Sequence, residues 1–438
     1  MDKKKKPAHT CAPETMMMGY GYNPWWSEGS VKPPLFLTST FLFQSAEEGE
    51  DHFKVAYGQK KSSKPAGLIY SRVNNPELEI LENRLAAWEN AEDAAVFSSG
   101  MAAISTMSLA MCKPGDQVIF GIPVYGGTSY LFENILPEFG IECIPVESGE
   151  NFVESVLELK KQKKLQNLKM IYFETPANPT IIMTDIEKVV TKLKKRLSTK
   201  KREVIIAVDN TFMGPVFQKV LPHGADFSVY SATKFLGGHS DLIAGAVLGR
   251  KDLMDMVKGY RTILGSMATP FVSWMLMRSL ETLKVRMEQQ ARNAEVMAKW
   301  LCEQPEVNYV LHPSLDNTRE AQKEICQKQC CGNGSLISFE VKGGKRRAFD
   351  ILNNVEHCKL AVSLGGTETL IEHPRTMTHS DVSPALQDRA GITPGMIRIS
   401  LGLENVDDII HDLDQAMKKA RKIVADKKAA RAAKKKKK

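Results

Sequence analysis

Residues 204–211 read Val-Ile-Ile-Ala-Val-Asp-Asn-Thr, and residues 227–234 read Phe-Ser-Val-Tyr-Ser-Ala-Thr-Lys. Each stretch opens with a short apolar run and ends in polar residues, which is typical of a strand buried on both faces of a sheet. Three further runs have the same character: 94–97, 117–120 and 170–173. Helical patterns, such as residues 152–163 and 186–196, separate the runs. This alternation predicts an α/β fold whose large domain is a doubly wound, mainly parallel sheet.

The rest of the chain divides into parts of different composition. Residues 1–75 are rich in Met, Pro, Gly and aromatic residues and show no sustained period, so we expect an irregular arm. The sheet domain spans residues 76–285. Residues 286–424 mix strand and helix patterns and predict a smaller α+β domain. Residues 425–438 are dominated by Lys, whose like charges repel, so we expect a disordered basic tail.

Composition and charge exclude several classes of protein. The 438 residues are 43% hydrophobic and 25% charged, which excludes a disordered or fibrous chain. The formal net charge of +8 comes from the two ends, because residues 418–438 carry a net +11 and residues 1–6 a net +3. The chain between them is therefore acidic. A solubilising tail is favoured over a nuclear address or a nucleic-acid contact.

The sequence also bears on the compartment. The longest charge-free stretch, residues 94–112, contains Ser, Thr and Gly and is a poor membrane span, and no apolar stretch follows Lys6 to form a secretory signal. Eight Cys in so long a chain are typical of free thiols in a reducing compartment, so we expect a cytoplasmic protein. Three of them, Cys326, Cys330 and Cys331, lack a paired Cys-x-x-Cys, so free thiols are favoured over zinc and no metal site is predicted.

Polar residues at the predicted strand ends suggest a site, because ligands of parallel α/β sheets bind beyond the carboxyl ends of the strands. Asp209 and Lys234 each follow an apolar run, and residues 98–101 open a helical pattern that could seat a phosphate. Pyridoxal phosphate needs an amine, an acid beside its pyridine nitrogen and anion donors. A turn cap at Asp209 and a solvated Lys234 would explain the same residues, so spacing alone leaves both interpretations open.

Blocks of sequence between residues 70 and 404 together resemble the Cys/Met-metabolism family of pyridoxal-phosphate enzymes. They follow the order of the family and span nearly the whole predicted body. The resemblance implies the aspartate-aminotransferase-like fold (fold type I) and pyridoxal 5′-phosphate as cofactor. The blocks are Tyr70–Pro76, Ser98–Met101, Tyr125–Gly127, Glu174–Pro179, Asp209–Thr211, Ser231–Lys234, Ser363–Gly366, His373–Pro374, Met377–His379 and Ile397–Glu404.

The resemblance also implies which residues hold the cofactor. Lys234 would bind it covalently and later act as general base at the substrate α-carbon. Asp209 would pair with the pyridinium nitrogen. Four residues would hold the phosphate, two by backbone N–H groups and two by hydroxyls: Gly100, Met101, Ser231 and Thr233.

Further roles implied by the resemblance concern the substrate. Tyr125 would stack on the cofactor ring and act as acid and base toward the leaving group. Asn178 would contact the ring hydroxyl. Arg398, together with Ser363, would hold the substrate carboxylate.

Two more residues, Tyr70 and Arg72, match positions that reach the phosphate of a neighbouring subunit in the family. The resemblance therefore implies a homodimer or homotetramer with shared active sites, to which the arm of each chain contributes. The aromatic and proline residues within positions 20–40 independently favour an interface, because no local period would bury them.

Two positions bear on the substrate. Members that use cystathionine commonly carry an acidic residue before the Ser-Leu-Gly block, whereas Val362 stands there in this chain. Valine cannot recognise the distal ammonium of cystathionine, which favours a small apolar γ-substituent or an acyl ester. Gly127 departs from the cysteine often found there in methionine γ-lyases. The segment 53–65 also departs from the common pattern, and we predict no function for it.

We therefore predict a methionine γ-lyase-like elimination on a sulfur amino acid. The alternative is γ-replacement on an O-acylhomoserine, as in sulfhydrylases or cystathionine γ-synthase. A catalytically silent scaffold or nucleic-acid-binding protein is the non-enzymatic alternative. The presence of Lys234, Asp209, Tyr125 and Arg398 argues against it.

Overall fold

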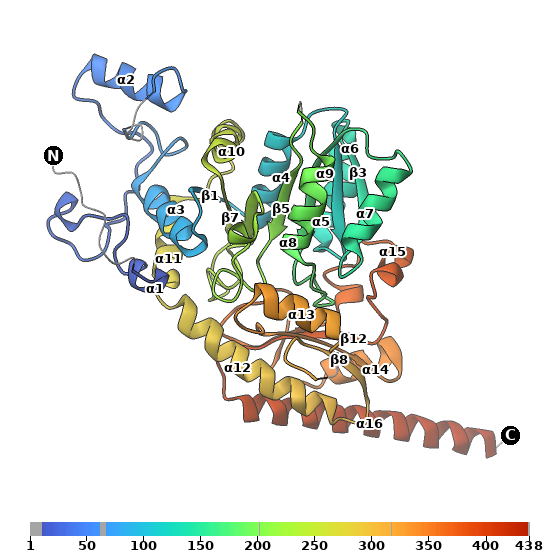
Figure 1. Cartoon of the computed structure of the whole chain (residues 1–438). Coiled ribbons are helices and arrows are strands. Elements are labelled where there is room, and N and C mark those ends of the chain that lie inside the picture. Colours follow the sequence, from blue (N-terminus) through green and yellow to red (C-terminus); the bar gives the residue numbers. More distant parts are fainter. Residues whose placement is uncertain (1–10, 62–66, 201, 317, 437–438) are drawn as a thin grey trace.

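The computed structural model describes residues 11–61, 67–200, 202–316 and 318–436, with the backbone alone from 424 onward (Figure 1). Within these residues a large seven-stranded sheet has the order β1-β7-β6-β5-β4-β2-β3. Strands β3, β2, β4, β5 and β6 are mutually parallel, whereas β7 is antiparallel to both β6 and β1. The predicted mainly parallel sheet is confirmed. Its strands are β1 (Asp93–Phe97), β2 (Gln117–Ile122), β3 (Glu142–Glu147), β4 (Leu168–Glu174), β5 (Ile205–Asp209), β6 (Phe227–Tyr230) and β7 (Gly245–Gly249).

Helices cover both faces of this sheet, as a doubly wound fold requires (Figure 1). Alternate residues of β2 show the division, because Val118 and Phe120 pack with α4 and α10 while Ile119 packs with α7 and α8. The helices of this domain are α3 (Pro76–Glu89), α4 (Gly100–Met111), α5 (Gly126–Tyr130), α6 (Leu136–Glu138), α7 (Phe152–Lys161), α8 (Ile186–Val189), α9 (Lys195–Leu197), α10 (Lys251–Leu264) and α11 (Pro270–Leu280).

The smaller domain is built on a second sheet, of order β10-β11-β12-β9-β8. Its strands are β8 (Val307–Leu311), β9 (Leu336–Val341), β10 (Lys359–Leu360), β11 (Leu370–Glu372) and β12 (Met396–Ser400). Helices α12, α14 and α16 pack on it around one apolar core. The predicted boundary at residues 285/286 lies within α12. The helices are α12 (Leu283–Cys302), α13 (Glu320–Gln329), α14 (Gly344–Leu352), α15 (Pro384–Arg389) and α16 (Val406–Lys436).

The arm packs only in part on its own chain. Helix α1 (Pro13–Met16) leads into Met17, which is buried against α3, whereas α2 (Ala46–Ala56) lies away from the body (Figure 1). Trp25 is 84% and Leu42 96% exposed, which leaves apolar arm surface without a partner in this chain. Residues 1–10 of the predicted arm, and 62–66 of the segment 53–65, lie outside the described residues.

The structure differs from the sequence-based expectation at the carboxyl-terminal tail. Helix α16 continues through residues 425–436, for which we expected disorder, while 437–438 lie outside the described residues. Ala, Lys and Arg all have high helix propensity, which explains the continuation despite the like charges. Separately, no helix in the described part of the chain is long and apolar enough to cross a membrane.

Candidate active site

The polar residues predicted to form a site gather at one edge of the large sheet. Glu174 and Asp209 end the adjacent parallel strands β4 and β5 and are partners in their register. Ser231 follows β6, and Lys234 stands three residues further on. Because the carboxyl ends of parallel strands meet at the same edge, Glu174, Asp209 and Ser231 lie along one edge of the sheet, and Lys234 follows in the loop after β6.

Lys234 lies between the two domains. Its Nζ donates a hydrogen bond to Ser363 Oγ, in the small domain, at 2.7 Å. Burial lowers the pKa of Lys234 to about 8, and the charge of Arg398 acts in the same direction. A lowered pKa increases the fraction of neutral amine, which is the nucleophilic and basic form.

Ser363 has a strained backbone. Its φ of 96° places a residue with a side chain in the left-handed region. Such a conformation costs about 1–3 kcal/mol and is found mostly at functional sites, where the surroundings hold it. Two hydrogen bonds hold Ser363 in this conformation. Its Oγ accepts from Lys234 Nζ, and its backbone O accepts from Arg398 Nη2 at 2.8 Å.

Arg398 lies on β12 and is only 2% exposed. Its Nη1 donates to Asn178 Oδ1 at 2.9 Å, and its Nη2 forms an ion pair with Glu372 Oε1 at 2.8 Å. Burial lowers the pKa of Arg398, and the carboxylate of Glu372 opposes that shift. Sequence reasoning missed Glu372, since its role depends on the pairing that sets it directly opposite Arg398.

Glu174 begins one of the family blocks, and the resemblance implied no role for it. In the structure its carboxylate joins two segments of the candidate site. Its Oε1 accepts from the backbone N–H of Tyr125 at 2.8 Å, and its Oε2 accepts from that of Asn178 at 3.0 Å. Burial raises the pKa of Glu174 to about 8, and the neighbouring Asp209 acts in the same direction. Hydrogen bonds and the Asn178 backbone therefore form a continuous path through Tyr125, Glu174, Asn178, Arg398, Ser363 and Lys234.

Asp209 is held by two donors. The backbone N–H of Thr211 donates to its Oδ1 and the hydroxyl of Tyr172 donates to its Oδ2, each at 3.0 Å. Burial raises the pKa of Asp209, although both donors favour its carboxylate form. Tyr172 belongs to an apolar run in the sequence, which gave no sign of this contact.

The beginning of α4 provides anion donors. Ser99 Oγ caps the helix by accepting from the N–H of Ala102 at 2.9 Å. The first N–H groups of a helix have no intrahelical acceptor, so those of Gly100 and Met101 can receive an anion. A Cβ on Gly100 would lie 3.0 Å from Ser231, so glycine permits the close approach of the two segments.

The predicted phosphate-binding hydroxyls differ in their surroundings. Ser231 is tied by its backbone N–H to Thr211 Oγ1 at 2.9 Å. Thr233 Oγ1 donates to Ala244 O at 3.2 Å and accepts from its N–H at 3.0 Å, so this hydroxyl already has backbone partners. Its predicted contact with a phosphate would therefore be an additional one.

Tyr70 and Arg72 are not joined to this group. Arg72 Nη1 donates to Thr262 O at 2.6 Å, and its guanidinium lies over the Tyr70 ring at 5.8 Å. Among the described residues, no hydrogen bond or ion pair connects either side chain to Lys234, Asp209 or Ser231. Their contribution to a neighbouring subunit therefore stays a prediction.

The residues fit pyridoxal 5′-phosphate. Lys234 supplies an amine of lowered pKa, Asp209 a partly buried acid, and the beginning of α4 a set of open N–H donors beside Ser231. These are the three kinds of group that the cofactor needs. The described residues include no group of three or more His, Cys, Asp and Glu side chains arranged for a metal ion.

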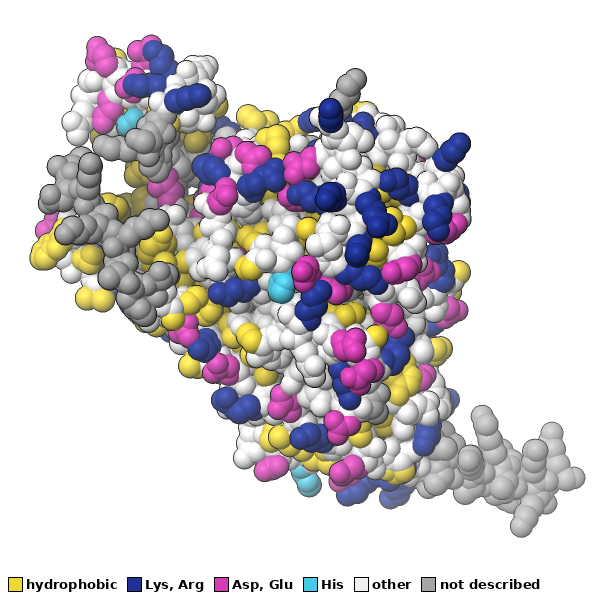
Figure 2. Space-filling model, viewed as in Figure 1, with side chains coloured by type: hydrophobic (Ala, Val, Ile, Leu, Met, Phe, Trp, Pro, Cys, Tyr) yellow, Lys and Arg dark blue, Asp and Glu magenta, His cyan; other side chains and the backbone are white. Residues whose placement is uncertain are grey.

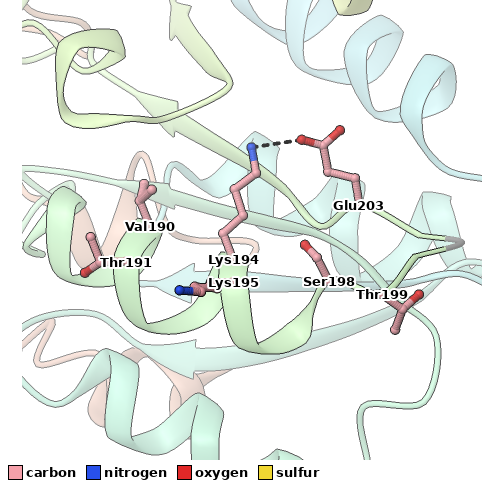
Figure 3. A pocket seen from close by; sticks show the side chains of 7 residues that line it. All are labelled: Val190, Thr191, Lys194, Lys195, Ser198, Thr199 and Glu203. Carbon is pink, nitrogen blue, oxygen red and sulfur yellow. Dashed lines mark ion pairs between the residues drawn. The ribbon is translucent and has the colours of Figure 1, made fainter.

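A surface cavity of about 680 Å³ lies elsewhere in the large domain (Figure 3). Its lining residues come from the segment 190–203 and include none of the group around Lys234. Its Lys194 forms an ion pair with Glu203 at 3.1 Å, so this charge is compensated locally. The cavity is therefore separate from the candidate active site.

The fold and the site together define a fold type I pyridoxal-phosphate-dependent enzyme. Residues 14–418 match the model of the family "Cys/Met metabolism PLP-dependent enzyme", and the chain belongs to this family. It is 40% identical to an L-methionine γ-lyase of Fusobacterium nucleatum over 89% of this chain and 94% of that protein. It is also 36% identical to cystathionine γ-lyase of Homo sapiens over 90% of each chain.

A solved structure of a related enzyme has the same fold. Cystathionine γ-synthase of Xanthomonas oryzae pv. oryzae, in complex with cystathionine, superposes with a TM-score of 0.83 at 30% identity, covering 94% of this chain and 99% of that chain. Relatives therefore include enzymes named for different substrates.

Proposed function

We propose that this enzyme catalyses γ-elimination on a sulfur amino acid, converting L-methionine and water to methanethiol, 2-oxobutanoate and ammonia. The observation that carries the proposal is the direct link from Lys234 through Ser363 to Arg398, which sets a buried guanidinium beside the reactive amine. Val362, the residue before Ser363, is 54% exposed and presents an apolar surface instead of a carboxylate. This favours a methylthio group over the charged end of cystathionine.

Pyridoxal phosphate, when bound, withdraws electrons from the α-carbon of the attached amino acid. Lys234 would hold the cofactor through Nζ, and the same amine would take the α-proton of the substrate. Its lowered pKa leaves much of the amine neutral near pH 8. The partly buried carboxylate of Asp209 would keep the pyridine nitrogen protonated.

Tyr125 delivers a proton to the departing sulfur. Burial raises the pKa of its phenol, and the carboxylates of Asp381 and Glu372 act in the same direction. The phenol therefore stays protonated at neutral pH and is ready to donate. Its side chain remains partly exposed, so the ring can meet both cofactor and substrate.

Positioning is divided among the remaining residues. The backbone of Gly100 and Met101 and the hydroxyls of Ser231 and Thr233 hold the phosphate, and Asn178 contacts the ring hydroxyl. Arg398 and Ser363 hold the substrate carboxylate, for which a guanidinium offers paired donors.

We also propose a homodimer or homotetramer in which Tyr70 and Arg72 complete the site of a neighbouring copy. Hydrophobic side chains gather on the arm side of the molecule (Figure 2), where Trp25 and Leu42 are almost fully exposed. Contiguous exposed apolar surface of this kind marks an interface. On the face of the body shown in Figure 2, Lys and Arg alternate with Asp and Glu, which does not favour a nucleic-acid surface there. The free thiols of all eight cysteines support a cytoplasmic location.

γ-Replacement on an O-acylhomoserine is the second candidate. The observation that favours it is Gly127, where a Cβ would lie 2.8 Å from the Tyr125 ring. Glycine therefore gives the tyrosine more room than a larger residue would, and this space could admit an incoming thiol.

The two candidates are separated by substrate. The purified enzyme is offered L-methionine, cystathionine, and O-acetylhomoserine with sulfide, and 2-oxobutanoate, methanethiol and homocysteine are measured. We expect 2-oxobutanoate and methanethiol from L-methionine at the highest kcat/KM. Faster homocysteine formation from O-acetylhomoserine would instead establish the replacement reaction.

A further inference from the structure

Glu174 holds the beginnings of two separate segments. One carboxylate oxygen accepts the N–H of Tyr125, which precedes α5, and the other accepts the N–H of Asn178, in the loop after β4. The side chain is 5% exposed. Its two oxygens therefore fix two backbones relative to each other in a region that water does not reach.

The influence of Glu174 extends into the small domain. Asn178 Oδ1 accepts from Arg398 Nη1 at 2.9 Å, so the backbone that Glu174 anchors also carries the amide that orients the guanidinium. One carboxylate thus lies between the residue proposed to protonate the leaving group and the residue proposed to bind the substrate carboxylate.

A negative charge on Glu174 costs free energy at this buried position. Glu174 ends β4 directly beside the partly buried Asp209 on β5, and two neighbouring carboxylates repel each other. A neutral amide of the same shape would avoid that repulsion, although it could not accept hydrogen bonds at both terminal atoms. Both oxygens of Glu174 accept N–H groups whether or not the side chain is protonated. The raised pKa favours the protonated form, and a pyridinium beside Arg398 would shift Glu174 toward the carboxylate, which adds negative potential there.

We propose that Glu174 is a positioning residue that aligns Tyr125 with Arg398 and stabilises the cationic groups between them. This inference rests on the proposed function. Altering Glu174 should displace both Tyr125, the proposed acid, and Arg398, which is proposed to hold the substrate carboxylate. The affinity of the protein for pyridoxal phosphate should also depend on the charge of Glu174.

The test compares Glu174→Gln with a matched control, Asp412→Asn. Asp412 is also buried and accepts backbone N–H groups, from Glu356 at 2.7 Å, His357 at 2.9 Å and Cys358 at 2.8 Å, but in the small domain on α16. The dissociation constant of pyridoxal phosphate from each cofactor-free protein is measured by absorbance. We expect a rise of about tenfold or more for Glu174→Gln and no change for Asp412→Asn.

A double-mutant cycle with Tyr125→Phe gives the second readout. Glu174→Gln should lower kcat/KM about tenfold to a hundredfold in the wild-type background and much less in the Tyr125→Phe background, because Glu174 acts through Tyr125. An unchanged affinity for pyridoxal phosphate would overturn the proposal. So would an equal loss of kcat/KM in the wild-type and Tyr125→Phe backgrounds. If Glu174→Gln does not fold, Glu174→Asp replaces it: it keeps the charge but cannot reach both N–H groups, so unchanged kcat there would also overturn the proposal. A wild-type protein that binds no pyridoxal phosphate would instead refute the proposed function.

Discussion

Glu372 lies directly across the β11–β12 strand pair from Arg398, and the two side chains form an ion pair at 2.8 Å with 1% and 2% of their surfaces exposed. Thr378 Oγ1 donates to the same carboxylate oxygen at 3.0 Å. The guanidinium is therefore neutralised and fixed in place by the protein itself. Removing one member of such a pair leaves an uncompensated buried charge.

We expect Glu372→Ala to lower the free energy of unfolding by about 3 kcal/mol. Glu372→Gln, which can still accept from Arg398, should lose less. Urea denaturation of the two variants measures the difference. A loss below about 1 kcal/mol for the alanine variant would show that Arg398 finds another partner.

Lys234→Ala should abolish turnover, because covalent catalysis through an amine leaves no ready substitute. The variant should also lose the visible absorption band and the cofactor attachment that borohydride makes permanent. Peptide mapping after reduction identifies the attachment site in the wild-type protein. Cofactor fixed to a different lysine in the variant would show that Lys234 has been wrongly assigned.

The lowered pKa of Lys234 predicts a pH dependence of stability in the cofactor-free protein. Between about pH 8 and 10.5 the unfolded state binds the proton that the folded state has released, so stability rises with pH across this window. Relative to Lys234→Met, the wild-type free energy of unfolding should gain about 2–3 kcal/mol between pH 7 and 10. A difference that stays flat would mean that Lys234 titrates as an exposed lysine.

Asp209→Asn should fold and still bind cofactor but lose most of its activity. The amide oxygen can still accept from the N–H of Thr211 while the amide NH2 donates to the Tyr172 hydroxyl, yet the amide cannot keep the pyridine nitrogen protonated. Circular dichroism checks the fold, and kcat for L-methionine checks the chemistry. Turnover close to the wild-type value would reduce Asp209 to a structural role.

Mixed oligomers test the proposed sharing of sites. Arg72→Ala and Lys234→Ala should each be inactive alone, while co-expressed subunits should recover part of the activity. Some sites in the mixture then combine an intact Lys234 with the partner's intact Arg72. Verified mixed dimers without activity would show that Arg72 does not serve a neighbouring copy.

The strands that could be predicted from the sequence are those buried on both faces of the sheet. The runs 204–208 and 227–230 became β5 and β6 because a wholly apolar stretch has few other stable places in an α/β domain. Strands β3 and β7 were missed for different reasons. The first is a partly exposed edge strand with charged ends, and the second begins and ends in glycine.

Residues of the site were predictable where a family block named them. Lys234, Asp209 and Arg398 belong to such blocks, and the structure groups them through 2.7–3.0 Å contacts with their neighbours. The roles of Glu372 and Tyr172 were not predictable, because each depends on which residue faces it across a strand pair. The φ of Ser363 is likewise a property of the folded loop, which no residue type announces.

The path from Lys234 to Arg398 crosses from one domain to the other through Ser363. Residues proposed to hold the cofactor within one chain all precede position 235, whereas those proposed to hold the substrate carboxylate follow position 362. Mutations in the later segment can therefore alter how the substrate carboxylate is held while the residues proposed to hold the cofactor stay unchanged. Such a division lets a lineage diversify its metabolism by small changes in one lobe, and it gives protein engineers a defined segment in which to redirect the enzyme.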